Sequence, residues 1–576
     1  MKVLGINAFG HDTSAVLVVD GHIVSAISEE RVSRKKHDRT FPSLSVNYLL
    51  KKENLKIDDI DAIGINMEIN FYINEFHFNN KYPIANETKQ MERVLPLLNL
   101  KQIIRDKLQF NGPIVEHYHH YCHLRAAQYQ SRFDKAILTS FDGIGEINSS
   151  SSAIYENGRI HSYKEHDKFP NSLGLVYSAL TDYLGWLHHC DEGIVMGLAP
   201  YGDQNENILG QKISYREFFK NIIKLDNDYQ VYLDLEYFDF QNQRDTWVSE
   251  KFKEIFGPKR KPEDEITEHH KNIAAALQNR IEEIIFEKIK DQFIKYPKIK
   301  SLCLSGGVAL NCSNNGKLLN SGLIENIFVQ PASGDDGCAI GAALLTYDIC
   351  KNGDLSKLPD SKSAAYLGPE YTEEEVKSAI KKLSIPFKKC SSITEKVSEY
   401  LLENKIVAWY KGGSEFGPRA LGHRSILAKP FPGSNKNYIN NKIKFREEFR
   451  PFAPIALAGE AKKYFDLDKP SPHMLYAIKA NSLGMKKCPA VVHIDGTARI
   501  QTVTKDLNKE IFELLTKFHH DSGIPVLLNT SFNVKGQPIV ETPDEAVKTF
   551  LDTAIDCLVI EDYVLIKENG EIISIH

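Results

Sequence analysis

The sequence lacks the features that mark secreted, membrane-spanning and polyanion-binding proteins. Its nine cysteines are scattered and include no CxxC pair, which argues against a disulfide framework and a zinc ribbon. No stretch approaches the roughly 18 apolar residues that cross a bilayer, and polar residues interrupt the first twenty, unlike a signal peptide. A formal net charge of −5 argues against nucleic acid held by global charge. We therefore expect a cytoplasmic protein with no membrane segment and no nucleic-acid partner.

The sequence contains enough apolar material for more than one core. Its 576 residues, 42% hydrophobic and 26% charged, have the composition of a globular protein, and their number predicts about two to four domains. The polar stretch at 351–362 predicts a domain boundary. Residues 70–86 predict an irregular insertion.

A repeated pattern indicates an internal duplication. Residues 2–27 and 136–163 each read as strand, polar turn, strand, Asp-Gly or Asn-Gly turn, and strand. Two facing lobes of this kind form a cleft, in which actin-like and sugar-kinase-like ATPases hold phosphates through backbone N–H groups. Two unrelated β-meanders would give the same pattern.

Residues 117–123 contain four histidines. On a helix His119 and His123 stand four apart, and His120 and His123 three apart, so either pair projects from one face. Such a pair is half of a metal site. The alternative is a histidine-rich helix start that faces solvent. A metalloprotease is disfavoured because no HExxH motif supplies a general base.

Two predicted strands, at 299–304 and 326–330, run into glycine turns that precede predicted helices at 312–319 and 338–347. The free N–H groups and positive dipole at a helix start suit an anion or nucleotide. We expect a nucleotide site that includes Gly306, Gly307, Asn311 and Gly334, with Asp335 facing the cleft.

Between these features lie a glycine-rich stretch and a charged one. Residues 191–202 favour a loop brought close to a ligand or to backbone, or a simple structural turn. Residues 203–297 predict a helical elaboration of the second lobe, with an amphipathic helix at 267–292.

Beyond residue 363 cations are interleaved with Gly, Pro and Asn. Guanidinium groups on glycine-bounded loops suit bidentate binding of phosphate or carboxylate, so this region predicts a pocket for a small polyanion. A solvated basic surface is the alternative. Nucleic-acid binding is a weaker interpretation, since no aromatic-basic repeat accompanies the cations.

Nine motifs, in order along nearly the whole chain, resemble those of the O-carbamoyltransferases of nodulation-factor, cephamycin and aminoglycoside biosynthesis. They are GHDTSA (10–15), HHYCH (119–123), FDGIGE (141–146), MGLAPYG (196–202), SGGVALN (305–311), GDDGCAIGAA (334–343), EFGPRALGHRS (415–425), FRPFAP (449–454) and LNTSFNVKGQPIV (528–540). One departure is Ile194, where this family commonly has Lys.

The resemblance implies an α/β fold: a duplicated actin-like (ASKHA/RNase H-like) domain at 1–355, with a helical insertion at about 203–297, followed by a YrdC-like α/β domain at 363–576. It implies that a divalent metal is held by His119, His123, Asp142 and Asp335, and that His11 acts on an acceptor hydroxyl. Two imidazoles and two carboxylates suit Fe2+ first, or Zn2+ or Mn2+. The residues implied to bind carbamoyl phosphate and ATP, the latter with Mg2+, are Arg419, Lys444, Arg450, Arg499 and Asn529.

The implied reaction is ATP-dependent O-carbamoylation. Carbamoyl phosphate and ATP would give carbamoyl-adenylate in the second domain, and this labile anhydride would pass by an enclosed path to the first. There the carbamoyl group would reach a hydroxyl of a glycoside, saccharide or other natural product, a choice we expect residues 70–95 and 203–265 to decide. The alternatives are a tRNA threonylcarbamoyl-type transferase and a non-catalytic actin-like nucleotide-binding module. The sequence predicts no oligomeric state.

Overall fold

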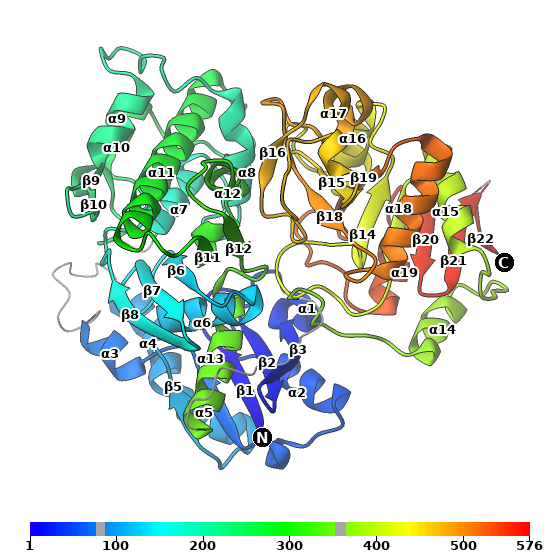
Figure 1. Cartoon of the computed structure of the whole chain (residues 1–576), viewed down its shortest axis with the longest axis horizontal. Coiled ribbons are helices and arrows are strands. Elements are labelled where there is room, and N and C mark those ends of the chain that lie inside the picture. Colours follow the sequence, from blue (N-terminus) through cyan, green and yellow to red (C-terminus); the bar gives the residue numbers. More distant parts are fainter. Residues whose placement is uncertain (76–86, 243–244, 352–363, 569, 576) are drawn as a thin grey trace. The chain divides into compact units, whose positions relative to one another are not determined.

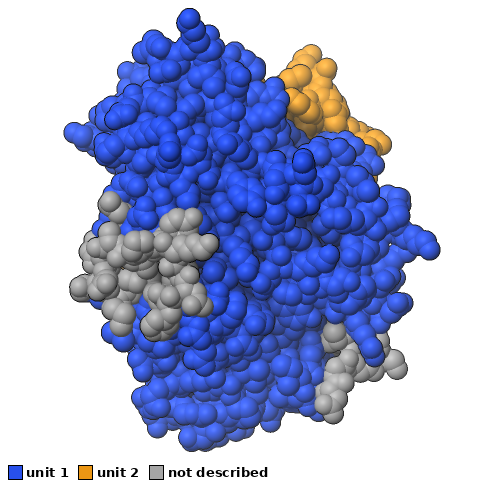
Figure 2. All heavy atoms as spheres, turned by 90° about the vertical axis from the view of Figure 1, so that its left-hand side faces the viewer, with its two compact units in different colours: residues 1–29, 37–361 blue, residues 30–36, 362–576 orange. Residues whose placement is uncertain are grey.

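The computed structural model describes residues 1–75, 87–242, 245–351, 364–568 and 570–575. The chain divides into two compact units (Figure 2): residues 1–29 and 37–361 form unit 1, and residues 30–36 and 362–576 form unit 2. The expected boundary at 351–362 lies, apart from Lys351, outside the described residues, as do residues 76–86 of the expected insertion.

The short segment Glu30–Lys36 belongs to unit 2, although the flanking chain belongs to unit 1. Arg31 Nη2 donates to the Gly417 carbonyl at 3.0 Å, and Arg34 Nη1 donates to the Ile539 carbonyl at 2.8 Å. Nothing in the local sequence indicates this exchange, because the partner carbonyls lie more than 380 residues away.

Unit 1 contains two five-stranded sheets with the same topology (Figure 1). The first has the order β3-β2-β1-β4-β5, and the second the order β8-β7-β6-β11-β12. In each, the first strand pairs antiparallel with the second and parallel with a later strand. The predicted duplication is therefore confirmed. The strands are β1 (Lys2–Asn7), β2 (Ser14–Val19), β3 (His22–Ser28), β4 (Ala62–Ile65), β5 (Ile114–Glu116), β6 (Ala136–Phe141), β7 (Ser150–Glu156), β8 (Arg159–Glu165), β11 (Ser301–Ser305) and β12 (Asn326–Val329).

Helix α13 (Asp335–Cys350) packs against β1, β4 and helix α6 (His119–Ser131). Glycine permits each of these contacts. A Cβ added at Gly5 would overlap the Ala339 carbonyl oxygen, and one at Gly341 would overlap the Cys122 carbonyl oxygen. Backbone therefore lies directly on backbone, which positions the first residue of α13 beside the first turn of α6.

Residues 203–297, the predicted helical elaboration of the second lobe, contain the long helix α11 (Glu268–Lys295). The expectation of a loop or turn at 191–202 is wrong: residues Glu192–Leu198 form α8, and Ala199–Tyr201 form a 3-10 turn. The helix forms because Ile194, Val195 and Leu198 share a buried face. The expected close approach to backbone does occur at Gly202, where a Cβ would overlap the Lys271 carbonyl.

Other helices and a hairpin complete unit 1 and the segment that joins it to unit 2. They are α1 (Glu29–Ser33), α2 (Ser43–Lys52), α3 (Ile69–Ile73), α4 (Glu87–Leu98), α5 (Leu100–Leu108), α7 (Leu173–Tyr183), α9 (Tyr215–Ile222), α10 (Glu250–Phe256), α12 (Cys312–Leu319), β9 (Ile223–Leu225) and β10 (Val231–Leu233). Among the described residues, no helix is both long enough and apolar enough to cross a membrane.

Unit 2 is built on a mixed eight-stranded sheet in the order β18-β15-β19-β14-β13-β20-β21-β22, in agreement with the expected α/β class. Its strands are β13 (Val407–Tyr410), β14 (Arg424–Ala428), β15 (Ala453–Leu457), β18 (Gln501–Val503), β19 (Val526–Ser531), β20 (Cys557–Ile560), β21 (Tyr563–Glu568) and β22 (Glu571–Ile575), beside a two-stranded ribbon of β16 (Ala477–Lys479) and β17 (Thr497–Arg499). The helices are α14 (Glu373–Lys381), α15 (Ile393–Leu402), α16 (Ser434–Ile439), α17 (Ser482–Lys487), α18 (Lys509–Ser522) and α19 (Pro543–Leu551).

We expect Gly341→Ala to destabilise unit 1, because the added methyl group must push α13 away from the Cys122 carbonyl. Overpacking of this kind costs about 1–3 kcal/mol. Gly193→Ala is the matched control: this helical glycine has no neighbour within 4 Å of an added Cβ, so alanine should be neutral or stabilise by up to about 1 kcal/mol. Thermal unfolding of the full chain measures both, and equal Tm values would contradict the packing described.

Candidate metal centre and cationic site

Helix α6 begins with the two histidines that the sequence placed on one face. His119 and His123 stand one turn apart, with relative exposures of 2% and 1% and ring centroids 4.7 Å apart. Two carboxylates face them. Asp142 follows β6, and Asp335 is the first residue of α13.

The four side chains converge on one point. His119 Nε2 lies 3.3 Å from Asp142 Oδ2 and 3.5 Å from Asp335 Oδ1, and the corresponding distances from His123 Nε2 are 3.8 and 3.9 Å. One ligand atom from each residue lies within 4.8 Å of all the others. The structure thus brings together the four residues that the resemblance named.

The donor set fits a divalent cation. Nε2 of His123 is buried and has no hydrogen-bond partner among the described residues. Two nitrogen or oxygen ligands of a tetrahedral metal, each about 2.1 Å from it, stand roughly 3.4 Å apart, close to the His119–carboxylate distances. Burial alone would raise the pKa of Asp142, but the hydrogen bond with His119 and the charges of His119 and His123 hold it well below its usual range. The carboxylate is therefore available as an anionic ligand.

Groups outside the cluster hold these ligands in place. Asp142 Oδ1 accepts the Gly307 N–H at 2.9 Å, and His119 Nδ1 lies 3.3 Å from Asn66 Nδ2. Such contacts fix the orientation of metal-ligating side chains. A sulfur also approaches: Cys338 Sγ lies 4.0 Å from His119 Nε2 and within reach of the same two histidines. Helical spacing does not indicate Cys338, because this residue lies next to α6 only through the packing of α13.

His120 does not join the cluster. Its Nδ1 lies 3.1 Å from Ser140 Oγ, and its Nε2 lies 2.8 Å from the Asn148 carbonyl. Burial, followed by the charge of His119, lowers the pKa of His120 to about 3. A neutral imidazole with both nitrogens engaged is a structural residue. Of the two pairs that helical spacing allowed, the structure assembles His119 and His123.

His11 lies in the turn between β1 and β2, with Nδ1 2.7 Å from Asp12 Oδ2. The other oxygen of Asp12 lies 2.7 Å from His37 Nδ1. Burial lowers the pKa of His11, but the Asp12 carboxylate outweighs it and raises that pKa well above its usual value. Asp12 was visible as the neighbour of His11 in the GHDTSA motif. No local signal marks His37.

A pair of asparagines joins this turn to the metal cluster. Asn7 Nδ2 donates to the His11 and Asp12 carbonyls at 3.0 and 3.1 Å. Asn66 Nδ2 donates to Asn7 Oδ1 at 3.2 Å and lies against His119. His11 and the four-residue cluster thus share one hydrogen-bonded support.

The residues expected to bind nucleotide in unit 1 are engaged with the protein itself. The Gly307 N–H is directed to Asp142, and Gly306 has φ +84° with no room for a Cβ against Phe141. The Asn311 side chain exchanges hydrogen bonds with Gln278, and the Gly334 carbonyl accepts the Gly337 N–H. Their nucleotide role stays a prediction.

In unit 2, strand β19 connects several of the expected ligands. Asn529 Nδ2 donates to the Ala420 carbonyl at 3.1 Å, which fixes β19 beside the loop that carries the half-buried Arg419. Two residues later, the side chain of Ser531 lies on the same face of the strand, and Lys444 Nζ donates to the Ser531 carbonyl at 2.8 Å and to its Oγ at 3.2 Å.

Lys444 stands in a cationic environment. It is 4% exposed, so at this position the cations are not a solvated surface. Burial, followed by the charges of Arg446 and Arg450, lowers the pKa of Lys444 well below its usual value. The charge of Arg499 contributes in the same way to lowering the pKa of Arg446. Among the described residues, Glu447 approaches Arg450 at 3.6 Å. The site therefore gathers a local excess of positive charge.

Two family profiles cover most of the chain. The profile described as carbamoyltransferase N-terminus matches residues 2–344, and that described as carbamoyltransferase C-terminus matches residues 398–567. These two matches define an enzyme that transfers carbamoyl groups. This chain belongs to the carbamoyltransferase family, as its motifs predicted.

Three relatives illustrate the similarity. The uncharacterized protein sll1178 of Synechocystis is 35% identical over 98% of this chain and 96% of its own. Nodulation protein NolNO of Sinorhizobium fredii is 34% identical over 98% of this chain and 80% of its own. The 3'-hydroxymethylcephem-O-carbamoyltransferase of Streptomyces clavuligerus is 33% identical over 49% of this chain and 51% of its own.

We expect His123→Ala to lower metal affinity at least about a hundredfold, beyond the effect of losing a supporting group, because it removes a ligand that faces both carboxylates. His120→Ala should keep the metal and instead lower the Tm, since it deletes hydrogen bonds to Ser140 and Asn148. Elemental analysis of the two purified variants measures metal content. Retention of metal in His123→Ala, or its loss in His120→Ala, would contradict this assignment.

Proposed function

We propose that this carbamoyltransferase is ATP-dependent and works in two stages. In unit 2, carbamoyl phosphate and water give carbamate and phosphate, and a carbamate oxygen attacks the α-phosphorus of ATP to give carbamoyl-adenylate and pyrophosphate. In unit 1, an acceptor hydroxyl takes the carbamoyl group and AMP leaves. The observation that carries this proposal is the presence of two chemically different centres in different units, one cationic and one of imidazoles and carboxylates.

The cations of unit 2 are suited to the first stage. Arg419, Lys444, Arg450 and Arg499 neutralise the charge that develops on phosphoryl oxygens, a role in which preorganised donors contribute most. Mg2+ accompanies the ATP. The buried Asn529 holds the Arg419 loop through the Ala420 carbonyl, so it positions a cation in addition to lining the site.

In unit 1, His119, His123, Asp142 and Asp335 hold a divalent metal, for which we expect Fe2+ and allow Zn2+ or Mn2+. When bound, the metal supplies Lewis acidity that polarises the carbamoyl group. The neutral form of His11 accepts the proton of the acceptor hydroxyl at Nε2, because its Nδ1 is held by Asp12. Since Asp12 raises the pKa of His11, this neutral form is favoured by high pH. Asp12 then stabilises the imidazolium that forms, as an orienting carboxylate does in a catalytic triad.

The acceptor is a hydroxylated glycoside or saccharide. The names of the Streptomyces and Sinorhizobium relatives support an O-carbamoylated small molecule or nodulation compound as the general class. Incubation of the enzyme with ATP, carbamoyl phosphate and a panel of glycosides should yield a product heavier by one CONH group. Mass spectrometry that finds AMP and pyrophosphate but no such product with any glycoside would reject this acceptor class.

Arg450→Ala should reduce carbamoyl phosphate-dependent release of pyrophosphate by roughly 10²–10³, the typical effect of removing one preorganised donor. Transfer from supplied carbamoyl-adenylate should continue at the wild-type rate, because the second stage uses unit 1. The control is Lys462→Ala, which removes a cation with a 75% exposed side chain in unit 2. Loss of both reactions in Arg450→Ala would argue against two separate centres.

Binding of phosphate-bearing ligands should be coupled to proton uptake. In the ligand-free protein, burial and neighbouring cations lower the pKa of Lys444, so at a pH above this lowered pKa the amine is mostly neutral. A bound anion favours the ammonium, raises the pKa again and draws a proton from the buffer. Calorimetric titration with carbamoyl phosphate in buffers of different ionisation enthalpy measures this uptake. It should vanish in Lys444→Gln and persist in Lys442→Gln, the exposed lysine of the same turn; equal uptake in both variants would refute the assignment to Lys444.

A further inference from the structure

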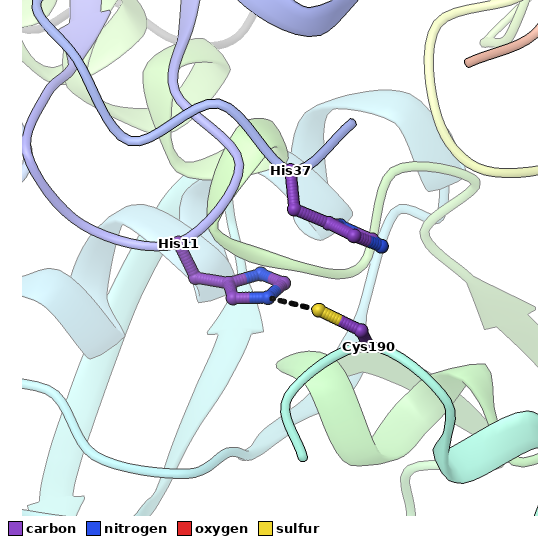
Figure 3. A group of neighbouring side chains, drawn as sticks. All are labelled: His11, His37 and Cys190. Carbon is purple, nitrogen blue, oxygen red and sulfur yellow. Dashed lines mark hydrogen bonds between the residues drawn. The ribbon is translucent and has the colours of Figure 1, made fainter. Parts of the chain in front are cut away.

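A second group of metal-binding side chains lies in unit 1. Figure 3 shows His11, His37 and Cys190 converging from three separate segments. One ligand atom from each residue lies within 4.8 Å of the other two, and His11 Nε2 is 3.7 Å from Cys190 Sγ. None of the three belongs to the cluster around His119.

Asp12 orients both imidazoles of this group. One of its carboxylate oxygens lies 2.7 Å from His11 Nδ1, and the other lies 2.7 Å from His37 Nδ1. A carboxylate on one ring nitrogen is the usual support for a histidine that binds metal through the other nitrogen. Nε2 of each ring is thus the nitrogen that a cation can reach, with the Cys190 sulfur opposite.

The backbone around this group is held in an uncommon conformation. Asp12 has φ +52° and His37 has φ +54°, in the left-handed region. Non-glycine residues persist there at a cost of order 1–3 kcal/mol, and such residues cluster at ligand sites. Two such residues, the bridging Asp12 and one of the histidines that it contacts, indicate a preorganised site.

We propose that His11, His37 and Cys190 form a binding site for Zn2+ or a cation of similar softness, supported by Asp12. Zinc binds sulfur at about 2.3 Å and imidazole nitrogen at about 2.1 Å, which for tetrahedral ligands places N and S about 3.6 Å apart. The observed 3.7 Å agrees with this separation. Three protein ligands leave a fourth position open to solvent or to an incoming group.

The two centres of unit 1 differ in ligand chemistry, and so select different metals. Two carboxylates and two imidazoles form a harder set than one thiolate and two imidazoles, and the thiolate favours zinc. Zinc at the second site occupies His11 Nε2. If the proposed function holds, zinc bound there removes the base of the transfer stage, so the site is inhibitory. Zinc should then slow carbamoyl transfer and leave pyrophosphate release in unit 2 unchanged.

Cobalt titration of the full-length protein, stripped of metal with a chelator, tests this site. Co2+ bound to a thiolate gives a sulfur-to-metal charge-transfer absorption that a carboxylate–imidazole centre lacks. We expect the wild-type chain to bind two equivalents, one of them with this absorption. Cys190→Ser should lose the absorption and one equivalent, and its affinity for Zn2+ at this site should fall at least about a hundredfold.

Cys338→Ser is the matched control, because Cys338 is the thiol beside the other centre. It should keep the charge-transfer absorption and both equivalents. Absorption that persists in Cys190→Ser, or that disappears in Cys338→Ser, would overturn the proposal. So would equal zinc stoichiometry in the wild type and Cys190→Ser.

A second pair of variants controls for the case in which Cys190→Ser loses metal because it misfolds. His37→Ala should also lose the second equivalent of metal. Asp12→Asn should lower the affinity of this site for Zn2+ about 10–100-fold, as loss of a supporting carboxylate does. Each variant should retain the metal of the His119 centre, which shows that unit 1 is folded. Unchanged zinc affinity in both would reject the site. These readouts need no turnover, so they stand or fall independently of the proposed reaction.

Discussion

The contact on which the candidate metal centre depends is the direct packing of backbone on backbone along α13. Gly5, Gly64 and Gly341 leave no side chain between this helix and β1, β4 or α6. The helix therefore cannot shift by even one methyl group without moving its neighbours. Asp335 at its first residue is held to the two histidines of α6 by this packing, before any metal contributes. Geometry within a few tenths of an ångström is what a metal site requires.

The fold of unit 1 could be predicted because its duplication repeats a local pattern of strands and tight turns. The pairing of His119 with His123 was accessible from helical spacing, since a helix places residues four apart on one face. The strand and turn pattern placed Asp335 at the cleft, but Asp142 and Asp335 were accessible as metal ligands only through family resemblance, because no periodicity relates them to α6. The helix at 192–198 was missed for a different reason: its glycines resemble a loop, while tertiary burial of Ile194, Val195 and Leu198 stabilises a helix.

The groups that the sequence did not reveal share one property, which is distance along the chain. His37, Cys190 and Cys338 reach their partners through tertiary packing, and His11, which approaches Cys190 at 3.7 Å, is 179 residues away from it. The same holds in unit 2, where Lys444 meets Ser531 across 87 residues. Residue type and spacing identify chemistry on a single element, but they carry little information on chemistry assembled between elements.

The asparagine pair that supports both centres of unit 1 has a thermodynamic consequence. Asn7 holds the turn with His11 and Asp12, and Asn66 connects Asn7 to His119. If a cation at one end alters this hydrogen-bonded connection, the free energy of binding at the other end changes. Such coupling is reciprocal, because the order in which two ligands bind cannot alter the total. Occupation of the second site would then alter binding at the first through these two asparagines.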